Sequence, residues 1–160
     1  MRPDGSDLKR LTTSPGSDTE PDWSPDGSKI VFTSTRSGSS DIWLMDADGS
    51  NQTQITDIIH SEFYPRWSPD GSKIMFTVDS FLAIDLHLVN PDGSNIEFTQ
   101  FRRYPYATRF GDWSPDELNV VFSSRVYSEF NLFKSNINGN TWIQVTFDDK
   151  REYYPSWSPL

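Results

Sequence analysis

Aromatic side chains gather in three short segments of this otherwise acidic chain, 57–65, 100–111 and 147–155, and the last two also carry arginine or lysine. Arginine and tyrosine are typical anchors of binding sites, and arginine is rarely buried without a partner. We therefore predict that these segments form a binding surface for a protein or a small acidic ligand, such as an acidic peptide, a carboxylate or a sugar acid. The predicted binding residues are Glu62, Tyr64, Arg102, Arg103, Tyr106, Arg109, Lys150, Arg151 and Tyr153.

The residues needed for catalysis are sparse. The chain has no cysteine, no Gly-x-Ser-x-Gly sequence and two histidines, which occupy different parts of a repeat described below. His60 and Glu62 would point the same way in an extended segment, but two ligands without a third do not make a metal site. His87 stands among aromatic residues and is predicted to pack there. We predict no enzyme activity, no metal and no cofactor.

The charge of the chain limits its partners. It carries 14 Lys and Arg against 23 Asp and Glu, a net charge of −9. Such a surface repels phosphate backbones and anionic lipids, so we predict neither nucleic-acid binding nor membrane insertion. No apolar run has the length of a membrane span, and the first residues lack the apolar core of a signal peptide. Any export signal is expected outside this sequence.

A repeat positions the segments. The sequence Trp-Ser-Pro begins at Trp23, Trp67, Trp113 and Trp157, at steps of 44, 46 and 44 residues. Each unit holds four runs of strand-forming residues, which we call strands a to d. The a–b connection reads Ser-Pro-Asp-Gly, and the c–d connection contains Asp-Gly in the first two units; both favour tight turns. The third unit has Glu117 at the turn glycine, where we expect a remodelled turn.

Strands b and c are apolar on both faces, as in "KIVFTS" at 29–34 and "DIWLMD" at 41–46. Such a sheet needs packing partners on each side, and neighbouring copies of the unit supply them. Units of about 40–45 residues with four strands, repeated radially, predict an all-β protein with the blades of a β-propeller. The variable d–a loops share one face of the ring and carry the predicted binding residues.

The phase of the repeat predicts one partial propeller over 1–160. Closed propellers have about 4 to 8 blades, so three blades leave two apolar faces uncovered. Three explanations remain open: the chain belongs to a longer propeller, two chains form a homodimer of six blades, or the ends of a monomer rearrange. We favour a homodimer or higher oligomer. The predicted units are a strand d at about 7–12, blades at 21–56, 65–100 and 111–146, and a strand a at about 154–158.

Repeats of the form "WSPDG…DADGS" resemble the propeller blades of the TolB family, and similar repeats occur in prolyl oligopeptidase and dipeptidyl peptidase relatives. The resemblance implies a non-catalytic scaffold that binds a protein or ligand. It also implies the periplasm or cell envelope as location, and a partner comparable to a peptidoglycan-associated lipoprotein. The alternative is an accessory, substrate-gating propeller of a peptidase whose catalytic domain is absent from this sequence. An enzyme similar to oligogalacturonate lyase would need a histidine cluster, and a fragment without a selected function also remains open.

Overall fold

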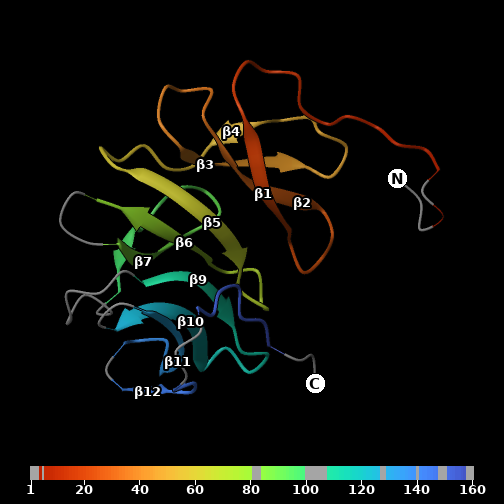
Figure 1. The fold of residues 1–160 in the computed structure, drawn as a ribbon. Helices are drawn as coiled ribbons and strands as arrows, with labels where there is room; N and C mark the ends of the chain where they lie inside the picture. The colour runs from red at the N-terminus through yellow and green to blue at the C-terminus, as the bar shows by residue number, and fades with distance from the viewer. Residues whose placement is uncertain are drawn as a thin grey trace.

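The computed structural model describes residues 4, 6–80, 84–99, 108–126, 129–139, 141–147 and 151–157. These residues form three four-stranded antiparallel sheets, or blades, in which each strand pairs with the next along the chain (Figure 1). No helix among the described residues is long and apolar enough to cross a membrane. The predicted propeller blades are thus confirmed. Blade 1 consists of β1 (Asp18–Trp23), β2 (Lys29–Ser34), β3 (Asp41–Asp46) and β4 (Thr53–Gln54). Blade 2 consists of β5 (Ser61–Trp67), β6 (Ile74–Asp79), β7 (Ile84–Val89) and β8 (Glu97–Phe98). Blade 3 consists of β9 (Thr108–Trp113), β10 (Asn119–Val126), β11 (Glu129–Asn136) and β12 (Trp142–Gln144).

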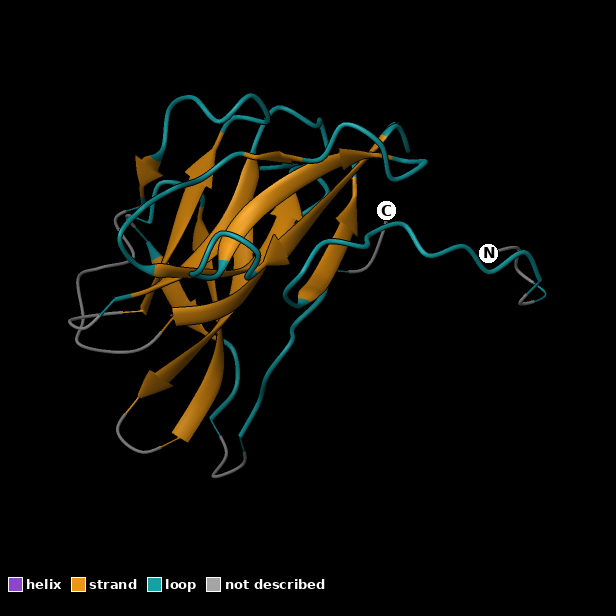
Figure 2. Cartoon of the chain, turned by 90° about the horizontal axis from the view of Figure 1, so that it is seen from above, coloured by secondary structure: helices purple, strands orange, loops and turns teal. Residues whose placement is uncertain are grey.

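The innermost strands β1, β5 and β9 correspond to strand a and lie side by side (Figure 1). Figure 2 shows that the described part of the chain consists of strands and loops. Each begins three or four residues before the predicted start of its blade. The strand continues past a bulge, and the alternation of residue types in the sequence does not reveal this bulge. The pairing register shifts at this bulge in all three blades. One residue there has a left-handed backbone, with φ of 56° at Glu20, 56° at Tyr64 and 55° at Phe110.

The a–b turns are held by their aspartates. In blade 1 the carboxylate of Asp26 accepts hydrogen bonds from the hydroxyl of Ser24 at 2.6 Å and from the backbone N–H of Ser28 at 3.0 Å. These bonds lower the pKa of Asp26 to about 2. The expected remodelling at Glu117 is not observed, because this residue adopts the left-handed φ of 61° that Gly27 adopts with 69°. The non-glycine residue costs about 1 kcal/mol in this conformation, and the turn is retained.

The hydrophobic core lies between the blades, as the two apolar faces of strands b and c predict. At the first junction, side chains of β2 and β3 pack against those of β6; at the second, side chains of β6 and β7 pack against those of β10 and β11. The first cluster contains Val31, Ile42, Leu44, Ile55, Trp67, Ile74, Phe76, Val78 and Val89. The second contains Met75, Leu86, Leu88, Trp113, Val120, Phe122 and Phe133.

The segment 7–12 is not a strand, in contrast to the prediction. Its contact with blade 1 nevertheless matches a contact between the first two blades. There, the end of strand d of blade 1 packs against blade 2 in the same way. A Cβ atom added to Gly49 would stand 2.7 Å from the carbonyl oxygen of Leu11, and one added to Gly93 would stand 2.9 Å from that of Ile55. The segment therefore takes the place of a preceding strand d, but the described chain offers it no strand c with which to pair.

Arg36 covers another part of the same face of blade 1. Its guanidinium lies over the ring of Trp43, 4.7 Å from the centroid, and 5.3 Å from that of Phe32. It also forms an ion pair with Asp18 at 2.8 Å, and little of the arginine side chain is exposed. This face is therefore largely covered within the chain.

The segment 151–157 is also not a strand, although strand a was predicted at about 154–158; residue 158 lies outside the described residues. Its backbone still follows the pattern of the inner strands. Tyr154 has the left-handed φ of 56°, and the backbone N–H of Trp157 donates to the carboxylate of Asp112 at 2.9 Å. The same bond joins Trp67 to Asp22 at 2.8 Å. The segment thus lies on blade 3 as β5 lies on blade 1.

Glu62 is fully buried at the junction of blades 1 and 2. Its carboxyl group accepts hydrogen bonds from the hydroxyl of Thr56 and, at 3.4 Å, from the backbone N–H of Ile58. The hydroxyl of Thr56 in turn accepts from the N–H of Ile42. Burial raises the pKa of Glu62 to about 7, and the nearby buried Asp41 adds repulsion.

This raised pKa predicts a pH-dependent stability. A carboxyl group that binds its proton more tightly in the folded chain stabilises it fully below about pH 4.5, and this contribution is lost as the pH rises through 7. We expect Glu62→Gln to match the wild type in urea unfolding at pH 5 and to be the more stable protein at pH 8. The gain is at most about 3 kcal/mol. Asp57→Asn, at an exposed carboxylate nearby, is the control, and an equal effect of Glu62→Gln at both pH values would contradict the assignment.

Candidate functional site

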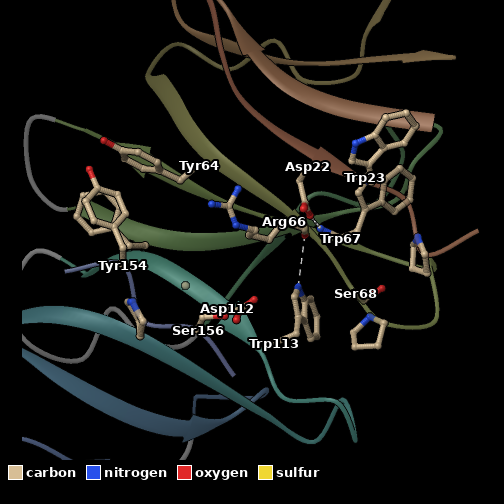
Figure 3. Close-up of a pocket in the computed structure, with 15 residues that line it drawn as sticks. Asp22, Trp23, Tyr64, Arg66, Trp67, Ser68, Asp112, Trp113, Tyr154 and Ser156 are labelled. Atoms are coloured by element: carbon tan, nitrogen blue, oxygen red, sulfur yellow. Dashed lines mark hydrogen bonds between the residues drawn. The ribbon is translucent and has the colours of Figure 1, made fainter. Parts of the chain in front are cut away.

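A pocket of about 430 Å³ lies between the innermost strands β1, β5 and β9 and the segment 151–157 (Figure 3). Three equivalent positions of the repeat contribute to its lining: the tryptophan that ends each inner strand, the residue before it, and, outside blade 1, the left-handed residue of the bulge. Because the same position of each blade faces the same space, differences between the copies determine the chemistry of the pocket.

The left-handed positions supply an aromatic wall. The ring of Phe110 lies 4.4 Å from that of Tyr64 and 4.1 Å from that of Tyr154, centroid to centroid, and Tyr153 contacts Phe110 at 5.8 Å. Burial raises the pKa of Tyr64 to about 12, so its hydroxyl keeps its proton and can donate at neutral pH. In Figure 3, Tyr64 and Tyr154 lie at the same end of the pocket.

The bulge that orients this wall is fixed by blade 1. There the left-handed residue is Glu20, whose carboxylate accepts from the backbone N–H of Tyr64 at 2.7 Å and from the hydroxyl of Thr33 at 2.9 Å. The side chain at one bulge thus holds the backbone of the next bulge. This contact compensates part of the cost of a left-handed tyrosine.

The positions before the tryptophans are Asp22, Arg66, Asp112 and Ser156. The two aspartates have a structural role, since each accepts the backbone N–H of the tryptophan on the following inner strand. Burial raises the pKa of Asp22, and the charge of Arg66 opposes this shift. Arg66 breaks the pattern because an arginine cannot accept such a bond. Its guanidinium donates to the carbonyl oxygen of Pro65 at 2.8 Å and, in Figure 3, points towards the end of the pocket that holds the tyrosines.

The predicted binding residues do not all belong to this pocket. Tyr64 lines it and Tyr153 touches its aromatic wall, whereas Glu62 is buried between blades 1 and 2. We therefore leave Glu62 out of the site proposed below. Four of the predicted residues lie outside the described part of the chain: Arg102, Arg103, Tyr106 and Lys150.

The two remaining arginines are engaged in ion pairs. Arg109 lies 3.5 Å from Asp79, and Arg151 lies 3.3 Å from Glu129, with about two thirds of its side chain exposed. Both are therefore partly neutralised by acidic neighbours. Exposed pairs of this kind contribute little to stability.

Arg66 is not among the predicted binding residues, although the sequence contains a signal for it. Alignment of the four copies on their tryptophans gives Asp, Arg, Asp and Ser at the preceding position. The other three copies have an acidic or small polar residue at this position. The arginine therefore indicates that in blade 2 the position does not accept the hydrogen bond that the aspartates accept. The clusters of arginine and tyrosine in the loops are a stronger signal in the sequence than this single change.

The described residues contain no group of three or more His, Asp or Glu side chains that could hold a metal ion. His87 is buried beside the rings of Phe76 and Phe98, at centroid distances of 5.7 and 4.9 Å, as the sequence predicts. The site offers a guanidinium, tyrosine hydroxyls and aromatic faces. This set of groups suits binding of an acidic group beside an apolar one.

The blades and the pocket between their inner strands define a β-propeller protein. A model of the "TolB beta propeller domain" family matches residues 1–160, and the chain belongs to this family. The Tol-Pal system protein TolB of Bordetella pertussis is 56% identical over 39 residues, which are 24% of this chain and 9% of that protein.

Solved structures show the same fold. A TolB-type structure from Agrobacterium tumefaciens has a TM-score of 0.77 and 25% identity, over 92% of this chain and 56% of the other. Puromycin hydrolase has a TM-score of 0.72 and 13% identity, over 89% of this chain and 24% of the other. This chain therefore spans only part of the length of the proteins it resembles.

The bond between inner strands can be tested at Asp22. Asp22→Ala leaves the buried backbone N–H of Trp67 without its acceptor, which we expect to reduce the free energy of unfolding by about 1–3 kcal/mol. Asp22→Asn keeps an acceptor oxygen and should lose clearly less. Urea unfolding of both variants measures the difference, and equal losses would show that the hydrogen bond is not the stabilising contact.

Proposed function

We propose that this chain is a non-catalytic β-propeller scaffold that binds a partner protein or peptide through a carboxylate at the pocket between the inner strands. The observation that carries the proposal is Arg66, the one cation at a repeat position otherwise occupied by Asp22, Asp112 and Ser156. A guanidinium offers paired donors that match a carboxylate. Aromatic side chains around such a group are typical of binding sites for peptides.

The surroundings of Arg66 favour a ligand with a single carboxylate. Asp22 and Asp112 lie in the same pocket, and the whole chain carries a charge of −9. A polyanion would be repelled by both, whereas one carboxylate next to an apolar or aromatic group can pair with Arg66 and pack against Tyr64 and Tyr154. Of the predicted ligand classes, this favours a peptide with an isolated acidic residue.

We also propose that a second copy of the chain completes the ring. The face of blade 3 that points away from blade 2 exposes Val145 and Phe147, by 52% and 78%, whereas Ile55, at the place of Val145 in blade 1, is 7% exposed. Two copies would supply six blades and cover this face. The similarity to TolB supports a location in the periplasm or cell envelope.

A substrate-gating role in a larger hydrolase is the second candidate, supported by the similarity in fold to puromycin hydrolase. A gating ring has no need to distinguish a carboxylate from a neutral group. Selectivity for the charged form of one ligand therefore separates the two candidates.

The binding proposal can be tested with N-acetylphenylalanine and its neutral amide as a matched pair of probes. We expect the wild-type chain to prefer the carboxylate, and Arg66→Gln to weaken binding of the carboxylate about 10- to 100-fold by removing charge-assisted hydrogen bonds worth about 1.5–3 kcal/mol. Affinity for the amide should be unchanged. Isothermal titration calorimetry or NMR titration at low salt measures both.

Arg151→Gln provides the matched control, because it removes the same charge from an exposed arginine outside the pocket. It should leave both affinities unaltered. If Arg151→Gln or Arg109→Gln abolished binding while Arg66→Gln had no effect, the site would lie on the loop face instead. Equal affinity for acid and amide would overturn the carboxylate proposal.

A further inference from the structure

The outermost strand of blade 2 has its side-chain alternation reversed relative to the other two blades. The pairing register places Phe98 opposite His87, at the place that Gln54 takes in blade 1 and Gln144 in blade 3. The residue after Phe98 is Thr99, and the residue at the equivalent position of blade 1 is the buried Ile55. Because side chains alternate between the faces of a strand, the apolar side chain of this strand lies on the other face. Phe98 is accordingly 74% exposed.

The reversal coincides with a pocket of about 500 Å³ at the seam between blades 2 and 3. Glu97 and Thr99 line it from the outer edge of blade 2, and the buried side chains of Leu88 and Trp113 line it as well. At the seam between blades 1 and 2, Ile55 belongs to the packed hydrophobic cluster. The shorter, polar Thr99 provides no such apolar filling at the second seam.

The rim of this seam pocket is predominantly acidic. It carries Asp70, Glu97 and Glu117 against one cation, Lys73, which is paired with Glu97 at 2.5 Å. Hydrogen bonds from Ser72 and Ser68 lower the pKa of Asp70, so its carboxylate is charged at neutral pH. The rim therefore attracts a positive charge next to whatever enters the apolar interior.

β8 is the outermost strand of its blade, and among the described residues it pairs only with β7. An exposed strand edge offers backbone hydrogen bonds to a peptide, and pockets beside the edge then select its side chains. The apolar walls, the acidic rim and the open edge are thus matched to one kind of ligand.

We propose that the seam pocket is a second binding site, which accepts an apolar side chain flanked by basic residues in an extended segment of a partner protein. The site adjoins the pocket that contains Arg66, since Ser68 and Trp113 line both, but it has the opposite charge preference. The apolar side chain takes the volume that Ile55 fills at the first seam, and the basic residues lie against Asp70, Glu97 and Glu117.

The test uses two blocked tripeptides, N-acetyl-Lys-Phe-Lys-amide and N-acetyl-Glu-Phe-Glu-amide, with the full chain. We expect the lysine peptide to bind at least about tenfold more tightly at low salt, and the difference to shrink at high salt as the charges are screened. NMR titration that follows the backbone amides of Thr99 and Ile137, which line the seam pocket and not the pocket with Arg66, reports binding in the seam. Equal affinities for the two peptides, or no response of these amides, would overturn the proposal.

Thr99→Ile restores the residue that blade 1 has at this place and should fill the pocket, so we expect at least a tenfold loss of affinity for the lysine peptide. Thr53→Ile makes the same change at an exposed position of β4 and is the matched control. Arg66→Gln should also leave this binding intact, which separates the two sites. Unaltered binding in Thr99→Ile would contradict the proposal.

Glu97→Gln tests the charge of the rim without filling the pocket. We expect it to reduce the preference for the lysine peptide about threefold or more, while the chain unfolds as the wild type does. If the preference remained at its full size in Glu97→Gln, the acidic rim would not be the selective element, and the proposal would fail even if Thr99→Ile did not fold.

Discussion

The stability of each blade depends on covering the apolar surface that both of its faces carry. The sheets are buried on both sides at β6, where Ile74 and Phe76 face blade 1 and Met75 faces blade 3. A single four-stranded sheet of this composition would expose most of its apolar surface to water, at a cost of roughly 25 cal/mol per Å². The stability of every blade is therefore a property of its junctions, and hydrogen bonds such as that from Trp67 to Asp22 fix how adjacent blades approach.

The two end faces of the chain meet this requirement differently. The first face of blade 1 is covered by the segment around Leu11 and by Arg36, which lies over Trp43. The last face of blade 3 is open around Val145 and Phe147. Lys134 stands in this blade where Leu44 and Leu88 are buried in the others, and its ammonium group lies 5.1 Å from the ring centroid of Trp157. The ends are therefore not equivalent copies of an inner junction.

The same repeat that makes the core also creates the candidate sites. Once a position has a fixed structural role in most blades, the blade in which that role is absent can present a different group to the same space. Arg66 is such a case among the inner strands, and Thr99 is one at the outermost strands. Both changes lie in blade 2, whose two faces are covered and whose backbone is therefore well supported.

The sequence was sufficient to predict the blades, because the step between tryptophans and the apolar strands b and c follow from one repeating unit. It did not reveal the bulges, since a left-handed Tyr64 or Phe110 leaves no mark in composition or spacing. Glu62 was assigned to a binding surface because it lies in one of the variable d–a loops, whereas the structure buries its carboxyl group against the hydroxyl of Thr56. The alternation at Phe98 was likewise hidden, because the letters of strand d match the other copies when shifted by one residue.

The central claim is that a second chain covers the face of blade 3 around Val145 and Phe147, which the described residues leave exposed. Multi-angle light scattering of the purified chain at low micromolar concentration tests this claim most directly. A mass of two chains, the smallest assembly that supplies six blades, is the predicted result. A mass of one chain that persists as the concentration is raised would show that the face around Val145 and Phe147 needs no partner, and would contradict the claim.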